Sequence, residues 1–282
     1  MKKNKNTIYK TLRPLAMLYF KIRYGGQTVG DAQIPKEGPI LICGNHIHSH
    51  DQFMPLRHTK RVVHYLAKKE YFDSKFAFFF RWAGCICVDR IAHDGKAISE
   101  AVEVLNQGGA VGLFPEGTRN TLYSKKDKIE EVYPYFKEDF TKEEFIDAAK
   151  ELKVKTSQIN LLLELKNNNK ISEKEFKEYF YNIDESLKEL IKRNVITEEE
   201  YKNSLLLPFK FGAVSMAQKT NATIITYAIY GDYKKSKKNL KIKFGEAFKV
   251  GDMPLEEANK KLFNIIRNLY IELKEEHEKE NK

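Results

Sequence analysis

Three histidines and one aspartate crowd into a short segment of this 282-residue chain. They are His46, His48, His50 and Asp51, and they follow an apolar run that ends at Gly44. In one interpretation His46 is a general base and Asp51 orients its imidazole ring, the arrangement that activates a hydroxyl group. On a straight helix these two side chains would diverge by about 140°. The pair therefore predicts a turn between a strand and a helix.

The same four residues permit a second interpretation, in which alternate histidines bind a metal ion. Their spacing resembles the His-x-His-x-Asp-His motif of metallo-β-lactamase-type hydrolases, but here the aspartate follows the third histidine. A metal-dependent hydrolase using His46, His48, His50 and Asp51 stays open as an alternative, and so does a polar turn without chemistry. We expect no metal, and we assign His48 and His50 as turn residues or substrate contacts.

A second polar segment, Glu116-Gly-Thr-Arg119, follows another apolar run that ends at Pro115. The planar guanidinium of Arg119 suits a phosphate, and Gly117 lets backbone N–H groups approach one. Glu116 can orient that arginine or accept a hydrogen bond from a substrate hydroxyl, and Thr118 adds a hydroxyl of its own. The segment therefore predicts a binding site for a phosphorylated ligand.

Both segments lie in a chain where short apolar runs alternate with helical patterns. Runs of this kind, bounded by Gly or Pro, predict buried strands over residues 39–43, 62–67, 84–88, 110–114, 222–230 and 240–244. Apolar spacings of three and four predict helices over residues 98–105 and 255–273. We therefore expect an α/β fold with a mixed, largely parallel sheet covered by helices.

The composition changes between residues 122 and 204, where glycine is absent and Lys and Glu dominate. Capping boxes mark helix starts at Thr141–Glu144, Ser172–Glu175 and Thr197–Glu200. We expect an all-α insertion with tandem hairpin-like repeats, acting as a lid, a partner dock, a membrane contact or a passive surface addition. The expected organisation is a basic amphipathic helix, a first α/β part, the insertion and a second α/β part, over residues 1–25, 26–121, 122–204 and 205–282.

Charge and apolar patterning favour an anionic membrane surface as partner. Lys+Arg 49 exceed Asp+Glu 39, which gives a formal charge of +10 and favours anions in general. The first 25 residues combine seven basic side chains and no acidic one with an apolar helical face, which is typical of a monotopic anchor. The aromatic run Phe76–Trp82 predicts a membrane or acyl-chain contact, or else a core helix.

Other features restrict the compartment and the partners. Three cysteines in apolar runs indicate a reduced compartment, and we find no secretory signal. No stretch approaches the roughly 18 uncharged residues that mark a spanning helix, and no nucleic-acid-binding motif occurs. We therefore expect a peripheral or monotopic protein on the cytoplasmic face of the cell membrane that does not bind nucleic acid.

Taken together, three blocks of the sequence resemble the glycerolipid acyltransferase family. They are Asn45-His46-x4-Asp51, Gly84-Cys-Ile-Cys-Val-Asp-Arg90 and Phe114-Pro-Glu-Gly-Thr-Arg119, in that order. Segments 67–72, 207–213 and 244–248 are similar to flanking parts of the family. The resemblance is strongest to the 1-acyl-sn-glycerol-3-phosphate acyltransferases, and it covers both α/β parts but not the insertion.

This resemblance implies an enzyme that moves a fatty acyl chain from a thioester to the hydroxyl of lysophosphatidic acid, giving phosphatidic acid. His46 would take the hydroxyl proton and Asp51 would hold the imidazole, so that the oxygen attacks the thioester directly, without an acyl-enzyme. The family's acceptor-binding positions match Arg90, Glu116 and Arg119. No cofactor is implied beyond the acyl donor, which is acyl-CoA or acyl carrier protein.

The resemblance leaves the substrates partly open. The same chemistry would serve a different acceptor: another lysophospholipid, a lipid-A-type precursor or an ornithine-lipid precursor. The alternative that is not an enzyme is a non-catalytic membrane-binding protein. Lys210 is a further phosphate contact or a solvated surface residue. The family's fourth block carries a proline where this chain has Thr226, within Ile224-Ile-Thr-Tyr227. Because that block shapes the acyl site, the chain length and the donor are not implied.

Overall fold

Two compact units make up the chain, and each is described by itself. The structure is a computed structural model that describes residues 2–89, 95–233 and 239–280. Unit 1 combines Met1–Gly117 with Phe209–Lys282, and unit 2 is Thr118–Pro208. Unit 2 thus contains the predicted insertion, 122–204, together with a few residues on either side of it.

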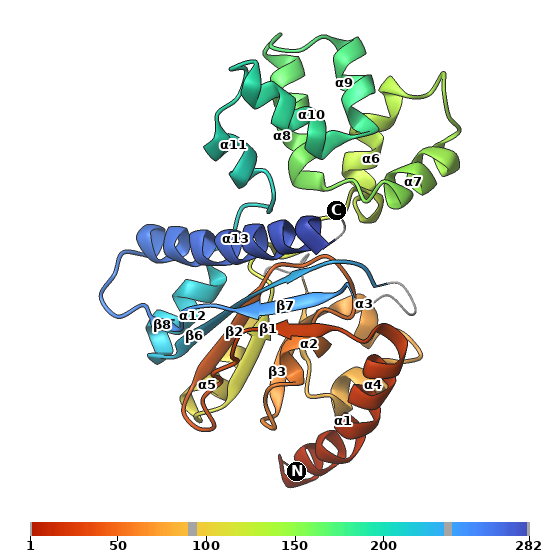
Figure 1. The fold of residues 1–282 in the computed structure, drawn as a ribbon. Coiled ribbons are helices and arrows are strands. Elements are labelled where there is room, and N and C mark those ends of the chain that lie inside the picture. Colours follow the sequence, from red (N-terminus) through yellow and green to blue (C-terminus); the bar gives the residue numbers. More distant parts are fainter. Residues whose placement is uncertain (1, 90–94, 234–238, 281–282) are drawn as a thin grey trace. The chain divides into compact units, whose positions relative to one another are not determined.

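One mixed sheet forms the centre of unit 1, with eight strands among the described residues (Figure 1). Its order is β1-β7-β6-β2-β5-β3-β4, with β8 also paired to β6. The neighbours from β6 to β4 run parallel, whereas β7 and β8 run antiparallel to β6. The strands are β1 (Gln27–Val29), β2 (Ile40–Gly44), β3 (Val63–Lys68), β4 (Ile86–Val88), β5 (Ala110–Leu113), β6 (Thr223–Tyr230), β7 (Lys241–Phe244) and β8 (Phe248–Lys249). The expected mixed, largely parallel sheet is confirmed.

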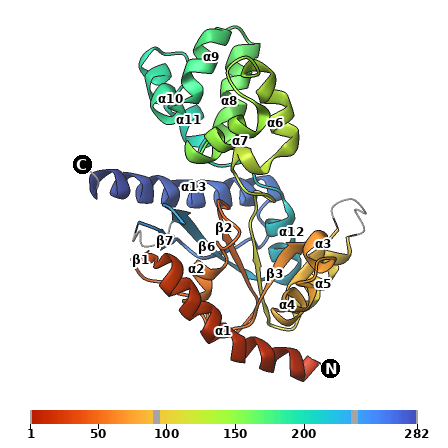
Figure 2. The ribbon, with the colours of Figure 1, turned by 90° about the vertical axis from the view of Figure 1, so that its right-hand side faces the viewer.

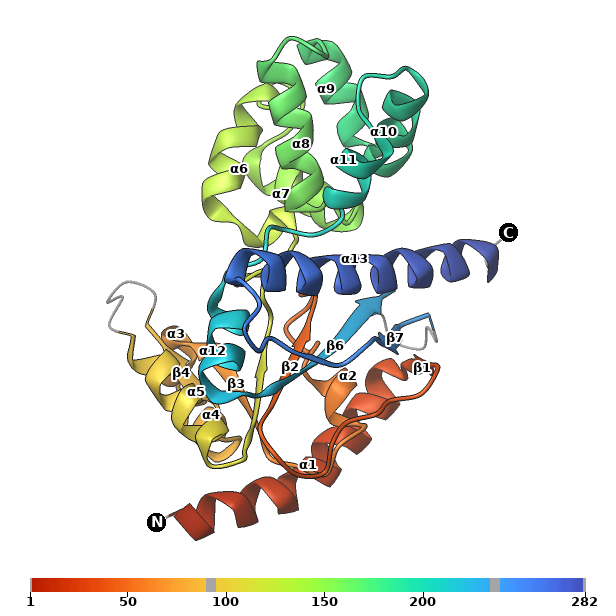
Figure 3. The ribbon, with the colours of Figure 1, turned by 90° about the vertical axis from the view of Figure 1, so that its left-hand side faces the viewer.

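Helices cover both faces of this sheet. The longest two, α1 and α13, lie on opposite sides of it in Figure 2 and in Figure 3. On the side of α1, Phe20 and Met54 pack into one apolar cluster with Ile40 and Ile42 of β2. On the other side, α5, α12 and α13 contact the strands and α12 contacts both other helices. The helices of unit 1 are α1 (Lys2–Tyr24), α2 (Phe53–Leu56), α3 (Lys69–Phe72), α4 (Ala77–Trp82), α5 (Lys96–Asn106), α12 (Gly212–Thr220) and α13 (Leu255–Glu280).

The topology places the two polar segments of the sequence side by side. β2 and β5 are parallel neighbours, with Cys43 opposite Leu113. Parallel strands direct their carboxyl ends to the same edge of a sheet, where ligands bind in open α/β folds. The loop after Gly44 and the loop after Leu113 therefore leave the sheet next to each other.

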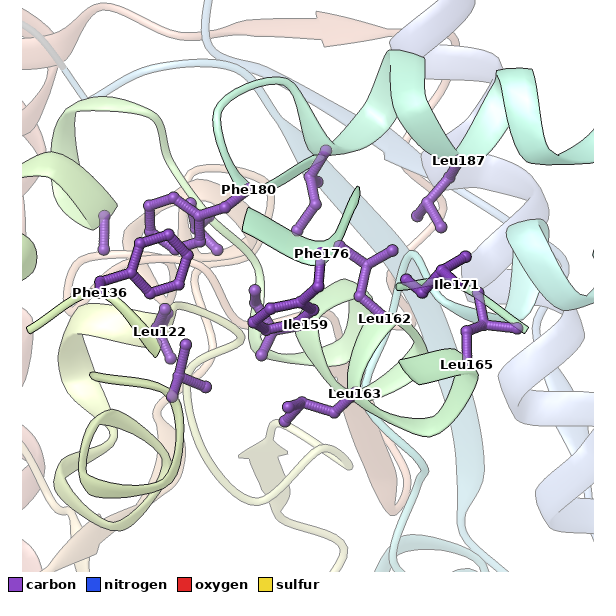
Figure 4. Packing of buried hydrophobic residues seen from close by; sticks show 14 of the residues in the cluster. Leu122, Phe136, Ile159, Leu162, Leu163, Leu165, Ile171, Phe176, Phe180 and Leu187 are labelled. Carbon is purple, nitrogen blue, oxygen red and sulfur yellow. The ribbon is translucent and has the colours of Figure 1, made fainter. Parts of the chain in front are cut away.

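Unit 2 is entirely helical in its described residues and has an apolar core of its own. Phe136, Phe145, Phe176 and Phe180 are fully buried in that core, and Figure 4 shows part of the cluster. The elements are η1 (Leu122–Ser124), α6 (Lys126–Val132), η2 (Tyr133–Tyr135), α7 (Lys142–Glu151), α8 (Thr156–Asn167), α9 (Glu173–Phe180), α10 (Ile183–Lys192) and α11 (Glu198–Asn203).

Local sequence signals explain where these helices start and stop. All three predicted capping boxes form, with Thr141, Ser172 and Thr197 each accepting from the backbone N–H three residues on. Asn169 and Asn194 adopt a left-handed conformation, with φ of 56° for both, which ends the preceding helix. Segments 169–172 and 194–197 are therefore each a helix stop followed closely by a capped helix start.

Candidate active site

His46 and Asp51 form a hydrogen-bonded pair in the loop between β2 and α2. The Nδ1 atom of His46 lies 2.7 Å from Oδ2 of Asp51. The backbone N–H groups of Ile47 and His48 donate to the same oxygen over 2.7 and 2.8 Å. The loop thus wraps around the carboxylate, which removes the divergence that a straight helix would impose on the pair.

The imidazole ring of His46 has a defined orientation. An ionised carboxylate only accepts hydrogen bonds, so a neutral imidazole facing the Asp51 carboxylate has its proton on Nδ1 and its lone pair on Nε2. The ring stacks on Phe114, with centroids 4.0 Å apart and planes 7° from parallel. Its side chain is 18% exposed, while that of Asp51 is fully buried. This geometry fits a general base held by a carboxylate.

Asn45 anchors the start of this loop to the sheet. Its side chain is buried and pairs with the backbone of Ile229 in both directions, at 3.0 Å from Nδ2 to O and 2.7 Å from N to Oδ1. The amide therefore continues the ladder between β2 and β6 beyond the end of β2. His46 leaves the sheet from a rigid point.

Glu116 connects the second polar segment to the first. It is 2% exposed, and its Oε1 atom accepts a hydrogen bond from the backbone N–H of His46 over 2.7 Å. The sequence predicts an arginine or a substrate hydroxyl as the partner of Glu116 and does not predict this contact. No local pattern signals it, because it depends on the pairing of β2 with β5.

Gly117 and Lys210 lie against each other although they are far apart in sequence. Gly117 has a φ of 69°, and a Cβ atom there would meet Cε of Lys210 at 3.0 Å. The backbone N–H of Lys210 donates to the carbonyl of Pro115 over 2.9 Å. The exposed amine of Lys210 is therefore held beside the loop that carries Glu116.

The remaining predicted site residues divide between unit 2 and the undescribed part of the chain. Thr118 and Arg119 are half-buried and belong to unit 2. The next residue, Asn120, is buried and bonds Ser157 and the carbonyl of Leu205, so it ties the two ends of unit 2 together. Arg90 lies outside the described residues. Unit 1 brings together His46, Asp51, Glu116, Gly117 and Lys210.

Two further residues of this region were not predicted as site residues. The hydroxyl of Tyr233 donates to Oδ1 of Asp51 over 2.6 Å. Lys68 is the last residue of β3, which is parallel to β5, so its strand delivers it to the edge that carries His46 and Glu116. The strand order could have suggested Lys68, but no pattern in the sequence points to Tyr233.

His48 and His50 have partners of their own. Nδ1 of His48 accepts from the backbone N–H of His50 at 3.2 Å, and Nδ1 of His50 is 3.0 Å from the hydroxyl of Tyr24. Burial lowers the pKa of His50, against the smaller opposing effect of Asp51. Among the described residues, no group of three or more His, Cys, Asp or Glu side chains is placed to hold a metal ion. The geometry therefore gives the metal-hydrolase interpretation no support.

Thr226, which stands where the family's fourth sequence block carries a proline, forms a hydrogen bond inside the fold. Thr226 is fully buried, and its hydroxyl donates to the carbonyl of Glu246 over 3.0 Å. The ring of the next residue, Tyr227, covers Gly44, where a Cβ atom would come within 2.2 Å of it. A bulky aromatic side chain thus packs directly on the strand that leads to His46.

Cys43, the cysteine nearest to His46 in the sequence, is not placed to act as a nucleophile. Cys43 lies in β2 and is fully buried, and burial raises the pKa of its thiol well above the usual range. A buried neutral thiol of this kind is a packing group and not a nucleophile.

Comparison with known proteins identifies the family. Residues 27–230, well over half of the chain, match the sequence profile of the family described as Acyltransferase. A 94-residue stretch is 33% identical to a 1-acyl-sn-glycerol-3-phosphate acyltransferase of Borreliella burgdorferi, covering 32% of this chain and 38% of that protein. A 60-residue stretch is 37% identical to an enzyme of the same name from Bacillus subtilis, covering 21% of this chain and 30% of that protein. The matches thus span about a third of each relative's length.

The fold has a counterpart among solved structures. The crystal structure of the 1-acyl-sn-glycerophosphate (LPA) acyltransferase from Thermotoga maritima superimposes with a TM-score of 0.54 at 15% identity, covering 95% of this chain and 79% of that one. At that identity the likeness concerns the fold alone. Profile, fold and the pairing of His46 with Asp51 agree, and the chain belongs to the Acyltransferase family.

Proposed function

We propose that this protein transfers a fatty acyl chain from a thioester donor to the hydroxyl of lysophosphatidic acid, giving phosphatidic acid. The observation that carries the proposal is the His46–Asp51 pair, with Nδ1 bonded to the buried carboxylate and Nε2 left as the proton acceptor. The names of the partly matched relatives support the choice of acceptor. The acyl donor, acyl-CoA or an acyl carrier protein, is a substrate and not a resident cofactor.

The reaction needs one base and no covalent intermediate on the protein. Nε2 of His46 takes the proton from the acceptor hydroxyl while its oxygen attacks the thioester carbonyl. Asp51 stabilises the imidazolium that forms, because its Oδ2 atom accepts from Nδ1. When the tetrahedral intermediate collapses, the C–S bond breaks and the thiolate leaves with the proton from Nε2. The products are an ester and a thiol, and His46 returns to its starting state.

Basic residues near these loops supply the charge that a phosphate monoester requires. Lys210 lies beside Gly117, and Lys68 ends the strand next to β5. Arg119 follows the same loop in sequence, and Arg90 occupies the corresponding place in the second block of the family motif. Within unit 1 we assign the phosphate to Lys210 and Lys68, and the glycerol part of the acceptor to the loop of Glu116 and Gly117; phosphate contacts of Arg90 and Arg119 are proposed from the family motif alone.

We further propose that unit 1 binds the surface of an anionic membrane, on its cytoplasmic face. Leu15, Leu18, Tyr19 and Ile22 of α1 are all more than half exposed, and their spacing places them on one face of the helix. We call this set the α1 stripe. Phe76, Phe78, Phe79 and Trp82 add exposed aromatic rings from the segment of α4, and α4 contacts α1.

Charge supports the same partner. Unit 2 contains 17 Lys and Arg against 19 Asp and Glu, so the whole positive excess lies in unit 1, whose formal charge is +12. Not all of it is available to lipid: Arg13 is used within the fold, where it donates to the carbonyls of Leu56 and Thr59. None of the helices among the described residues is long and apolar enough to cross a bilayer. A peripheral membrane contact is typically made by an amphipathic helix whose apolar face is flanked by basic side chains.

The test is a matrix of donors and acceptors with the purified full-length protein. Acyl-CoA and acyl carrier protein of several chain lengths would each be combined with lysophosphatidate, other lysophospholipids and glycerol 3-phosphate in mixed vesicles. The proposal predicts phosphatidic acid as the main product. Transfer to another acceptor in preference to lysophosphatidate would move the proposal to that lipid, and no transfer in any combination would contradict it.

A further inference from the structure

Tyr233 reaches the catalytic loop from the segment that follows β6. Its hydroxyl donates to Oδ1 of Asp51 over 2.6 Å, whereas Oδ2 receives the three N–H donors of the loop itself. A carboxylate offers about four acceptor positions. The buried carboxylate of Asp51 therefore receives four donors, three on Oδ2 and one on Oδ1, and Tyr233 supplies the one that comes from outside its loop.

The ring of Tyr233 is fixed by aromatic neighbours on two other elements. It stacks on His48, with centroids 4.1 Å apart and planes 16° from parallel. It also meets Tyr24 and Phe20 of α1 edge-on, at 5.3 and 6.3 Å. Because the ring is held on these sides, the hydroxyl has a fixed position relative to Oδ1.

The hydroxyl also stays protonated. Burial, and after it the charge of Asp51, raises the pKa of Tyr233 well above its ordinary value. The group therefore donates over the whole range in which a histidine base changes charge. Other ionisable groups near Asp51 are His46, His48 and His50 of its own loop, Tyr24 of α1, Tyr65 of β3 and Tyr227 of β6.

We propose that Tyr233 is a positioning residue for acyl transfer, which sets the orientation of Asp51 and how strongly Asp51 draws on the Nδ1–H of His46. The inference rests on the proposed function for its kinetic part. Each donor to a carboxylate takes up part of its negative charge, so four donors make Oδ2 a weaker acceptor than three would. Removing the Tyr233 donor would therefore strengthen the bond between Oδ2 and the Nδ1–H of His46, which favours the imidazolium form over the neutral ring.

The test variant is Tyr233→Phe, which keeps the ring and its stacking on His48 but removes the donor. The matched control is Tyr230→Phe, which removes a hydroxyl three residues earlier, from a ring that packs on Tyr270 and His277 of α13. Tyr233→Leu removes ring and hydroxyl together. Two-dimensional amide NMR spectra of each full-length variant would establish that the fold is kept.

The first readout does not need activity. The Nδ1–H proton of His46, identified by its loss in His46→Gln, gives a low-field NMR signal because it is bonded to a buried carboxylate. In Tyr233→Phe this signal moves further downfield, since Oδ2 has become the stronger acceptor; in Tyr230→Phe it stays in place. An unmoved signal in a folded Tyr233→Phe variant would overturn the inference even if the protein proved to have another activity.

The second readout is the pH dependence of kcat/KM for acyl transfer. The acid limb of the profile is expected to shift to higher pH by about half a unit to one unit in Tyr233→Phe, in keeping with the loss of one hydrogen bond to a charged group. Tyr233→Leu shows the same shift with a further fall in kcat. A lower melting temperature with an unshifted acid limb would make Tyr233 a packing residue only. Absence of transfer by the wild-type protein would refute the proposed function and leave the NMR result to decide the role of Tyr233.

Discussion

The backbone N–H of His46 donates to the buried carboxylate of Glu116 over 2.7 Å, across 70 residues of sequence. The contact ties the start of the catalytic loop to the loop after the neighbouring strand. Phe114 in that same loop carries the stacked imidazole ring. The two polar segments therefore form one candidate site, in which the second segment positions His46, the proposed base.

Removing the carboxylate of Glu116 should slow acyl transfer although His46, the proposed base, is unchanged. In Glu116→Ala the part-buried N–H of His46 loses its acceptor, which costs about 1–3 kcal/mol and lowers kcat about fivefold or more. Glu116→Gln keeps a carbonyl acceptor at the same place, so a smaller loss is expected. Steady-state kinetics with saturating donor measure both, with the exposed Glu100→Ala as control. A Glu116→Ala variant with the wild-type kcat would remove Glu116 from this role.

Substitution of Gly117 should act on acceptor binding. The Cβ atom of Gly117→Ala would press on Lys210, and alanine is strained at a φ of 69°. We expect KM for lysophosphatidate to rise about fivefold or more, with a smaller change in kcat, because about 1 kcal/mol of strain falls on the binding loop. Lys210→Gln should raise the same KM.

A glycine elsewhere in unit 1 provides the control for that experiment. Gly95 has a φ of 64° but nothing within 4 Å of a Cβ atom there. Gly95→Ala therefore reports the effect of left-handed strain that lies outside the binding loop. Equal KM changes in Gly95→Ala and Gly117→Ala would show that the contact with Lys210 is not responsible.

Polar substitution of the α1 stripe should release the protein from membranes. Leu18→Ser with Ile22→Ser removes two exposed apolar side chains, which should weaken vesicle binding about tenfold or more if each contributes about 1 kcal/mol or above. Sedimentation with anionic and with neutral vesicles measures the effect, and added salt should weaken the anionic case more. Leu152→Ser in unit 2 alters an exposed leucine outside the stripe. Vesicle binding that is equal in all three proteins would disprove the membrane contact.

The capping boxes predict a pH-dependent stability of unit 2. The backbone N–H and the hydroxyl of Ser172 lower the pKa of Glu175 from 4.5 to about 2. A carboxyl whose pKa is lower in the folded state stabilises that state above the unfolded pKa, and this stability disappears as the pH falls through the folded value. Glu175→Gln should therefore cost about 0.5–1 kcal/mol at pH 7, and the cost should shrink between about pH 4.5 and pH 2.

Urea unfolding followed by far-UV circular dichroism, at pH 7 and pH 3, measures that difference in the full chain. Trp82, the single tryptophan of the sequence, lies in unit 1. Its fluorescence therefore follows the unfolding of unit 1 separately from that of unit 2. A cost that is the same at both pH values would mean that the charge of Glu175 is not what stabilises the helix start.

The parts of the fold that sequence reasoning anticipated are those with strong local signals. The apolar run at 39–43 became β2, and each capping box became a helix start, because short-range patterns decide such elements. β1 and β8 were missed, since strands of three and two residues leave no periodic pattern. The last helix runs to Glu280, beyond the predicted end at residue 273, because its charged final turns lack a stop signal.

The site shows the same division between local and long-range information. His46 and Asp51 could be paired from their spacing, because the pair forms within one loop. The contacts of Asp51 with Tyr233 and of His46 with Glu116 could not, because they depend on which strands are neighbours in the sheet. Arg119 was assigned to one motif with Glu116, yet the boundary between the two units falls inside that motif.

The most direct test of the account is acyl transfer by His46→Ala. Purified wild-type and variant proteins, shown to be equally folded by circular dichroism, would be given labelled lysophosphatidate and the acyl donor preferred in the matrix. We predict that labelled phosphatidic acid forms with the wild type and that kcat falls about 10³-fold or more in the variant, the contribution expected of a general base. Phosphatidic acid formed by His46→Ala at the wild-type rate would contradict it.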